Sequence, residues 1–441
     1  ADAQRLDAFL AALQAVVDRH DVLRTAVMAQ QASVPVQVVC RQVTLEVGTI
    51  DLDTEQDTYA QLQARLKMSP VVDMARAPLL YTSVARDGHT GEAYLLVQLH
   101  HIILDHVGVE VIQAELMAHM QGGEHVLTDS IPYREFVAHA LHQARYNDAS
   151  AFFRDMLWDV DESTAPFGLL AMHDVGMDVD EARKKLDEDL ANRIRLAARS
   201  YSVSSATVFH TAWALVLALC SGRDDVVFGT VLSGRLQGTR GAQDMLGMFI
   251  NTLPLRLRTQ GLNVTQLLMQ TDAALKALLP YEQASLAMAQ RCSSLQGGAA
   301  LFSAILNYRH SEAPAGHGIT AGGGIEILGA QERTNYPFTV SVDDMSDGFV
   351  IDAQIAVSAG AERVLGYLEA VLAGLTEALL ATPDQAAADV AILPLIERQY
   401  LLQTLNATQA DYPQEHCIHE LFEAQVARTP AQVALVYGDE Q

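Results

Sequence analysis

The spacing of hydrophobic residues along the chain alternates between that typical of helices and that typical of strands. The first apolar residues recur every three or four positions, which predicts a helix; they are Leu6, Phe9, Leu10, Leu13, Val16 and Val17. The stretch RHDVLRTAV at 19–27 then becomes strand-like. Apolar runs at 77–86 and 92–101 flank the turn-rich DGHTG, which predicts neighbouring strands. A second helical face follows and predicts the order strand, loop, helix; it consists of Val109, Ile112, Leu116 and Met120.

The second half of the chain repeats this mixture of elements. It contains, in order, the predicted helix SATVFHTAWALVLALCSG, the strands DVVFGTVLSG and MFINTLPLRLR, a further helix and the strand LFSAILNYR. Between the halves, the polar stretch from Asp159 to Lys185 lacks periodicity and is interrupted by Pro166. We therefore predict an α/β (mixed α+β) protein with two lobes, at 1–165 and 166–397.

Composition narrows the classes of protein and partner. Half of the 441 residues are hydrophobic and 19% are charged, which excludes a largely disordered chain. The 29 basic and 54 acidic residues give a formal charge of -25, which disfavours nucleic acid and anionic membrane surfaces as partners. The four cysteines are scattered without CxxC spacing, so we expect a reducing cytoplasm. No apolar run reaches the ~18 residues of a membrane span, and no leader segment is recognisable.

The segment LHHIILDH, at 99–106, concentrates three imidazoles and a carboxylate. In a continuing strand His100 and His101 would point to opposite faces, which disfavours a metal site. Two interpretations stay open. The histidines satisfy a strand end while Asp105 caps the next helix, or one histidine is a general base that works near neutral pH. The Gly-rich stretch 315–331 lacks the context of a phosphate loop and is predicted to be a plain loop.

The same segment resembles the HHxxxDG signature of condensation domains in nonribosomal peptide synthetases. Two further stretches, RHDVLRT and MLGMFINTLPLR, are similar to motifs of that family. A third, YEQASLAMAQ, lies where a weaker motif of the family is expected, and all four follow the family order. The resemblance runs from Ala1 to about Leu395. We expect a linker at 398–417, and 418–441 resembles the start of an adenylation domain. The family's first motif, SxAQxRLWFL, has no counterpart before Ala1, so we expect an opening element outside this sequence.

The resemblance implies both a fold and a reaction. Family members have two chloramphenicol-acetyltransferase-like lobes that form a V-shaped pseudo-dimer with a central tunnel. An upstream (donor) and a downstream (acceptor) peptidyl carrier protein deliver thioesters on phosphopantetheine arms, and the acceptor amine attacks the donor thioester. The chain itself would bind no cofactor directly. Its partners would be the two carrier proteins and the adjoining adenylation domain, in the cytoplasmic biosynthesis of a secondary metabolite such as an antibiotic peptide.

Motif matching also implies roles for individual residues. His101 would face the tunnel and either deprotonate the acceptor amine or hold it by a hydrogen bond. His100 would pack inward as a structural donor. Asn307, in ILNYR, lies about where the family has an asparagine that could orient the thioester or the oxyanion. Satisfaction of a strand end is an equally good interpretation of Asn307.

The resemblance implies that Asp105 forms an ion pair, which holds the motif loop in place. Its candidate partners are Arg24, Arg235 and Arg256, and the sequence does not select among them. We expect Arg24 and Arg256 to give structural support, and we also count Arg235 among the residues near the substrate.

The motif departs from the family pattern because His106 stands where glycine is usual. Either Gly108 now meets the backbone requirement, or the added imidazole supports modification of the acceptor, for instance dehydration of a serine or threonine. We therefore count His106 and Gly108 as candidate substrate-binding residues. Epimerisation and non-catalytic docking of carrier proteins remain alternative functions, although non-catalytic relatives tend to lose the histidine found here at position 101.

Overall fold

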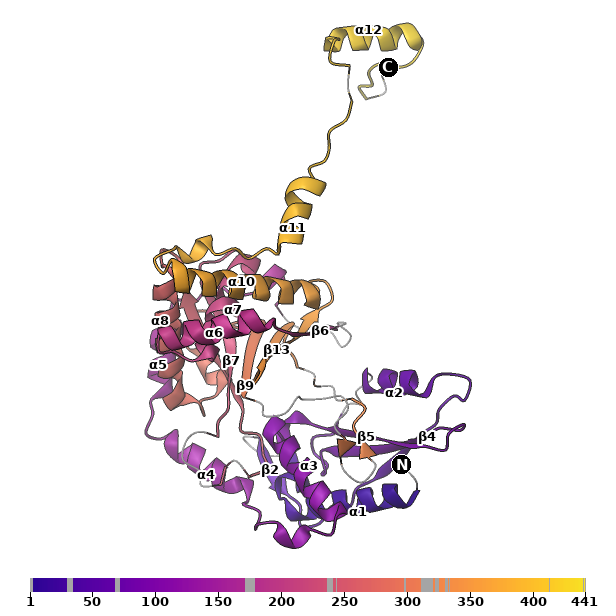
Figure 1. Cartoon of the computed structure of the whole chain (residues 1–441), viewed down its shortest axis with the longest axis vertical. Coiled ribbons are helices and arrows are strands. Elements are labelled where there is room, and N and C mark those ends of the chain that lie inside the picture. Colours follow the sequence, from indigo (N-terminus) through magenta and orange to yellow (C-terminus); the bar gives the residue numbers. More distant parts are fainter. Residues whose placement is uncertain are drawn as a thin grey trace. The chain divides into compact units, whose positions relative to one another are not determined.

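The computed structural model describes most of the chain. The described residues are 3–29, 35–67, 72–170, 179–235, 241–242, 244–296, 299–310, 320–321, 325–329, 332, 334–411, 413–438 and 440. They divide into two compact units, Ala1–Ile392 and Leu393–Gln441. Figure 1 shows the whole chain coloured along the sequence.

The first half of the larger unit combines two small sheets with four long helices. The helices are α1 (Ala3–Arg19), α2 (Thr58–Lys67), α3 (His106–Met120) and α4 (Tyr133–Gln143). Antiparallel β1 (Thr25–Met28) and β2 (Val36–Val39) form one sheet. The other has the order β3 (Val47–Ile50), β4 (Leu80–Arg86), β5 (Ala93–Leu99), with β4 and β5 as the predicted neighbouring strands. Both helices predicted here are confirmed, as α1 and α3.

Helices α1 and α3 pack against each other and form the core of this half. Their apolar residues at helical spacing meet in one cluster, which includes Leu13, Val16, Val17 and Leu116. Leu246, from the second half of the sequence, is buried in the same cluster. The two halves therefore share a hydrophobic contact within one unit.

The second half contains a six-stranded sheet in the order β6-β13-β12-β9-β7-β8. Its strands are β6 (Val179–Lys185), β7 (Asp225–Leu232), β8 (Asn251–Arg258), β9 (Ala304–His310), β12 (Phe338–Met345) and β13 (Gly348–Ala356). The pairs β12·β9 and β9·β7 are parallel, and the other pairs are antiparallel. The helices are α5 (Ala149–Leu157), α6 (Glu188–Ser200), α7 (Ser205–Ser221), α8 (Val264–Leu278), α9 (Leu286–Arg291) and α10 (Ala361–Ala381).

The two faces of the six-stranded sheet differ in chemistry. Alternate residues face α6, α7 and α10 and are apolar, such as Leu306 of β9, Val340 of β12 and Ile351 of β13. The opposite face, here called the polar face, carries charged, amide and hydroxyl side chains. Its members include Arg183, Asn307, Arg309, Ser341, Asp343, Asp352 and Gln354, which the strand registers place on the same side.

Helix α10 has the length and hydropathy of a membrane span, and 56% of its most apolar window is buried within the protein. It packs on β13, β6, α6 and α7. Its apolar residues therefore serve as the core beneath the sheet.

Two predictions for the segments between the main elements need correction. The polar stretch from Asp159 to Lys185, which lacks periodicity, ends in the strand β6. This strand lies at the edge of the sheet and needs to bury only one of its two faces, so it can consist largely of polar residues. The Gly-rich stretch predicted as a plain loop contains a two-stranded pair, β10 (Thr320–Ala321) and β11 (Ile325–Glu326). Its residues 315–319, 322–324 and 330–331 lie outside the described residues.

Candidate functional site

The two adjacent histidines lie just beyond the end of a strand. β5 ends at Leu99, and a 3-10 turn spans His101–Ile103, so the predicted strand is two residues too long and its alternation does not extend to the histidines. The Nδ1 atom of His100 accepts a hydrogen bond from the backbone N–H of Ile102 at 3.1 Å. The expected structural donor is thus an acceptor, and burial lowers the pKa of His100, which favours this neutral form.

His101 is held through both ring nitrogens. Its Nδ1 donates to the carbonyl of Leu104 at 2.7 Å, and its Nε2 lies 2.8 Å from Oε1 of Glu332. Hydrogen bonding to Glu332 raises the pKa of His101, and the same contact lowers the pKa of Glu332. Because a carbonyl and a carboxylate can only accept, both ring nitrogens donate and the ring is an imidazolium in this arrangement. Its side chain is 36% exposed, so a substrate can reach it.

Asp105 fixes the loop that carries His101. It caps α3 by accepting the N–H of Gly108 at 2.9 Å, and it forms two hydrogen bonds with Arg235, at 2.6 and 3.1 Å. The side chains of Asp105 and Arg235 are 1% and 5% exposed. A charged pair that is excluded from water in this way has few competing partners, so it sets the position of the loop.

Arg235 is therefore the arginine, among the three predicted candidates, that pairs with Asp105. It also donates to the carbonyls of Ala242 and Met245, and its guanidinium carbon lies 3.9 Å from the ring centre of Phe249. These contacts enclose Arg235 in protein, which corrects its predicted place among the substrate-binding residues.

The other two arginines support distant parts of the unit. Arg24 donates to the carbonyls of Cys40 and Arg41, next to the end of β2. Arg256, on β8, binds Asp225 and Asp159, with 2.6 Å between its Nη2 and Oδ2 of Asp225. Among the contacts that the structure describes, neither arginine reaches Asp105.

Two of the other sequence motifs contact this loop or the helix that follows it. Arg19 and His20, from RHDVLRT, bind Glu115 of α3 at 3.1 and 2.8 Å and so anchor the helix that Asp105 caps. From MLGMFINTLPLR, the carbonyl of Gly247 accepts the N–H of Asp105 at 3.3 Å. These motif residues position the histidine loop, although they lie far apart in the sequence.

His106 and Gly108 occupy the first turn of α3. His106 has helical geometry, so no unusual backbone angle requires glycine there. A Cβ atom at Gly108 would lie 2.4 Å from Cδ1 of Leu104, so close packing requires glycine at this position. This supports the first interpretation of the altered motif. It also corrects the predicted substrate-binding role of Gly108, which is buried. Nε2 of His106 lies 3.4 Å from Oε1 of Glu110.

Asn307 lies half-buried on the polar face. It is two residues before Arg309, whose Nη1 is 3.8 Å from Oε2 of Glu332, so both side chains leave β9 on the side of the candidate base. No contact joins Asn307 to His101 among the described residues. The structure therefore places Asn307 on the relevant face without assigning it a reacting atom.

Glu332 and Arg309 are the members of this site that sequence reasoning missed. Glu332 is 231 residues after His101, in a polar stretch with no motif. Arg309 follows the expected Asn307 by two positions, so strand alternation could have placed it on the same face.

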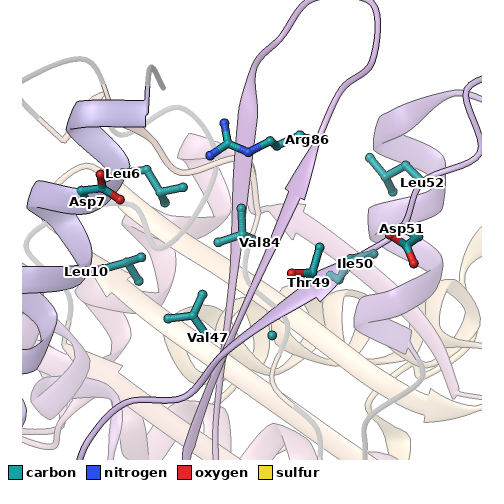
Figure 2. Close-up of a pocket in the computed structure, with 11 residues that line it drawn as sticks. Leu6, Asp7, Leu10, Val47, Thr49, Ile50, Asp51, Leu52, Val84 and Arg86 are labelled. Atoms are coloured by element: carbon teal, nitrogen blue, oxygen red, sulfur yellow. The ribbon is translucent and has the colours of Figure 1, made fainter.

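The surface also has a hollow of about 470 Å³ with a separate lining. Figure 2 shows the side chains that line it. It is lined by residues of α1, β3 and β4, among them Leu10, Val47 and Arg86. None of the candidate site residues lines it. Among the residues that the structure describes, no group of three or more His, Cys, Asp or Glu side chains could hold a metal ion.

Comparison with known families places this site in context. The family model for the condensation domain matches residues 3–402. The chain belongs to the condensation-domain family. The match covers the histidine loop, the Asp105–Arg235 pair and the six-stranded sheet, so these features are parts of one family fold.

Curated relatives of this condensation domain are large synthetases. The chain is 41% identical to malpibaldin synthetase and 39% identical to malpinin synthetase, both of Mortierella alpina, over 99% of its length. It is 31% identical to a linear gramicidin synthase of Brevibacillus parabrevis over 97% of its length. It spans only 8%, 6% and 9% of these relatives, so it corresponds to one part of such a protein.

Solved structures of condensation domains share the mixed α/β, chloramphenicol-acetyltransferase-like fold. A four-domain nonribosomal peptide synthetase bound to AMP and glycine matches with a TM-score of 0.79 and 16% identity, over 97% of this chain and 34% of that one. The first condensation domain of the calcium-dependent antibiotic synthetase, solved with a substrate analogue, matches with a TM-score of 0.67 and 18% identity, over 88% and 91%. The predicted fold class is confirmed.

Replacement of Asp105 by alanine should destabilise the condensation domain strongly. Arg235 would remain buried without its counter-charge, which typically costs about 3–5 kcal/mol. We expect a clearly lower denaturation midpoint in urea, followed by circular dichroism. Asp347→Ala is the control, because Asp347 pairs with Lys185 at the surface and should leave the midpoint near that of the parent. Equal midpoints for Asp105→Ala and the parent would contradict a structural role for the pair.

Replacement of Gly108 by alanine should also lower stability. The added methyl group would overlap the buried side chain of Leu104, and overpacking of this kind costs about 1–3 kcal/mol. The measurement is the thermal midpoint, with Gly123→Ala as control because a Cβ there meets its nearest atom at an ordinary 3.5 Å. If both variants melt at the same temperature, close packing at Gly108 is not required.

Proposed function

We propose that this condensation domain forms a peptide bond between two carrier-bound thioesters in nonribosomal peptide synthesis. The observation that carries the proposal is the hydrogen-bonding state of His101. Because Nδ1 is committed to the buried carbonyl of Leu104, a proton would be exchanged with a substrate through Nε2, which faces the partly exposed carboxylate of Glu332. Nε2 lies at the half-exposed end of a loop that is otherwise fixed by buried contacts.

The reaction requires modest help from the protein. The α-amine of the acceptor attacks the thioester carbonyl of the donor, a C–N bond forms and the C–S bond breaks. The nitrogen loses a proton and the leaving thiolate gains one, and Nε2 of His101 can carry that proton or hold the amine by a hydrogen bond. Much of the rate would come from confinement, since two tethered reactants gain a high effective concentration.

The partners follow from this reaction. An upstream and a downstream carrier protein would present the donor and the acceptor on phosphopantetheine arms, in the cytoplasm. We place 398–417 as a linker and 418–441 as the opening of an adenylation domain. In support, helix α12 (Ile418–Arg428) leaves Ile418, Phe422 and Val426 exposed within its unit, as expected for an element that the rest of a domain would cover.

Replacement of His101 by alanine should remove most amide formation and leave the fold intact. General acid–base groups contribute about 100-fold or more to a rate, and the side chain is exposed enough to be dispensable for folding. The measurement is the rate of dipeptidyl thioester formation between two loaded carrier proteins, by mass spectrometry. His89→Ala is the matched control, because His89 is exposed in the β4–β5 turn. Retention of a near-parental rate in His101→Ala would show that positioning alone drives the reaction.

The same assay separates the alternative functions. With a serine or threonine acceptor, we expect the parent and His106→Gly both to give an intact dipeptide, because helical geometry at His106 does not depend on its side chain. Loss of one water mass in the parent, absent in His106→Gly, would instead indicate a dehydrating variant. Inversion of the α-carbon without condensation would indicate an epimerase, and no product would indicate a docking domain.

A further inference from the structure

A row of alternating charges crosses the polar face and ends at the candidate base. Its members, in order, are His101, Glu332, Arg309, Asp343, Arg183 and Asp352. The row extends over four strands and the segment before β12, and neighbouring groups have opposite signs. Its two ends are not equivalent, because only one of them meets a group expected to take part in chemistry.

The middle of the row is tightly bound, whereas its end at Glu332 is loosely held. Nε of Arg309 lies 2.8 Å from Oδ1 of Asp343, a carboxylate that is only 2% exposed. The same guanidinium is 3.8 Å from Glu332, beyond hydrogen-bonding distance. Glu332 is 46% exposed, and the amide of Gln354 donates to its backbone carbonyl at 2.5 Å. The backbone of Glu332 is thus anchored while its carboxylate can accept another partner.

The charge count of the row leaves a place for one cation. Glu332, Asp343 and Asp352 carry three negative charges, and Arg309 and Arg183 carry two positive charges. The excess negative charge is balanced by the imidazolium of His101. When His101 is neutral, the partly exposed carboxylate of Glu332 can bind a different cation.

We propose that Glu332 receives the α-ammonium group of the acceptor aminoacyl thioester and holds it beside Nε2 of His101. This inference rests on the proposed function and assigns the recognition of the acceptor within that site. A primary ammonium is the cation that the acceptor itself brings, and its N–H groups form strong charge-assisted hydrogen bonds with a carboxylate. Glu332 is a positioning residue in this scheme.

The protons balance over one cycle. As the ammonium binds Glu332, His101 releases its Nε2 proton to solvent. The ammonium then gives one proton to Nε2 and becomes the nucleophilic amine. It attacks the thioester, the C–N bond forms, the C–S bond breaks, and the second nitrogen proton passes to the leaving thiolate. The products are an amide, a thiol and an imidazolium paired with Glu332, which is the state seen in the structure.

The other charged groups around the pair do not replace this arrangement. Burial lowers the pKa of His100, which favours its neutral form. His106 lies beside Glu110 and contributes only at longer range to lowering the pKa of Glu332. Arg309 is bound to Asp343. Because the pKa of Glu332 is lowered, it stays ionised as the pH rises through neutrality.

The first measurement is the titration of His101 by NMR in the intact chain, with the signal assigned from His101→Gln. In the parent, His101 should titrate above the ordinary value of about 6.5. Glu332→Gln should lower this pKa, because it removes the negative charge that stabilises the imidazolium form of His101. Glu110→Gln, which changes a carboxylate next to His106, should leave the titration of His101 unchanged.

The second measurement uses two small probes, an aminoacyl pantetheine thioester and its analogue without the amino group. The parent should bind the amine-bearing probe about tenfold or more tightly than the analogue, as expected for a charged hydrogen bond. Glu332→Gln should lose this preference. The amine-bearing probe should also lower the pKa of His101 in the parent, because it displaces the imidazolium from Glu332, whereas the analogue should not.

The outcomes decide whether Glu332 recognises the acceptor ammonium or only holds the ring of His101 in place. A lower pKa of His101 in Glu332→Gln, without any preference between the probes in the parent, would overturn the proposal and leave Glu332 with the second role alone. An unchanged pKa, or no response of His101 to the amine-bearing probe, would also overturn it. These readouts do not require bond formation. If they agree with expectation while loaded carriers yield no amide, the proposed function fails and the ammonium site remains.

Discussion

The buried ion pair between Asp105 and Arg235 is the constraint on which the candidate site depends. It joins a loop of the first half to a segment of the second half across 130 residues of sequence. Two charges removed from water must satisfy each other, so the loop has one favourable position. The capped first turn of α3 and the Gly247 carbonyl reinforce that position. His101 is therefore presented by a rigid support.

The motifs divide into structural and chemical parts. RHDVLRT anchors α3 through Glu115, and MLGMFINTLPLR encloses the loop with Gly247 and with Phe249 beneath the guanidinium of Arg235. These residues are largely buried and explain most of the sequence pattern. The groups suited to proton transfer, His101 and Glu332, are instead partly exposed. A substrate can reach them without disturbing the buried contacts.

The six-stranded sheet connects the fixed histidine loop to Glu332, the side-chain partner of His101. Its apolar face is covered by α6, α7 and α10, while its polar face carries Asn307 and Arg309. A charged group on this face is costly unless it is paired. Pairing along the row thus orders Arg309 and Asp343, and it leaves one exposed carboxylate, Glu332, near the histidine.

The sequence by itself determined the alternation of helices and strands and the family resemblance, and it singled out His101 and Asp105 as candidate site residues. Helical and strand periods report local burial, so α1, α3 and α7 followed from them. Only the tertiary structure decided that Arg235 pairs with Asp105, that His100 is an acceptor in a turn and that Glu332 meets His101. Each of these depends on contacts between distant segments, and the spacing of residues along a chain carries no information about which distant segments meet.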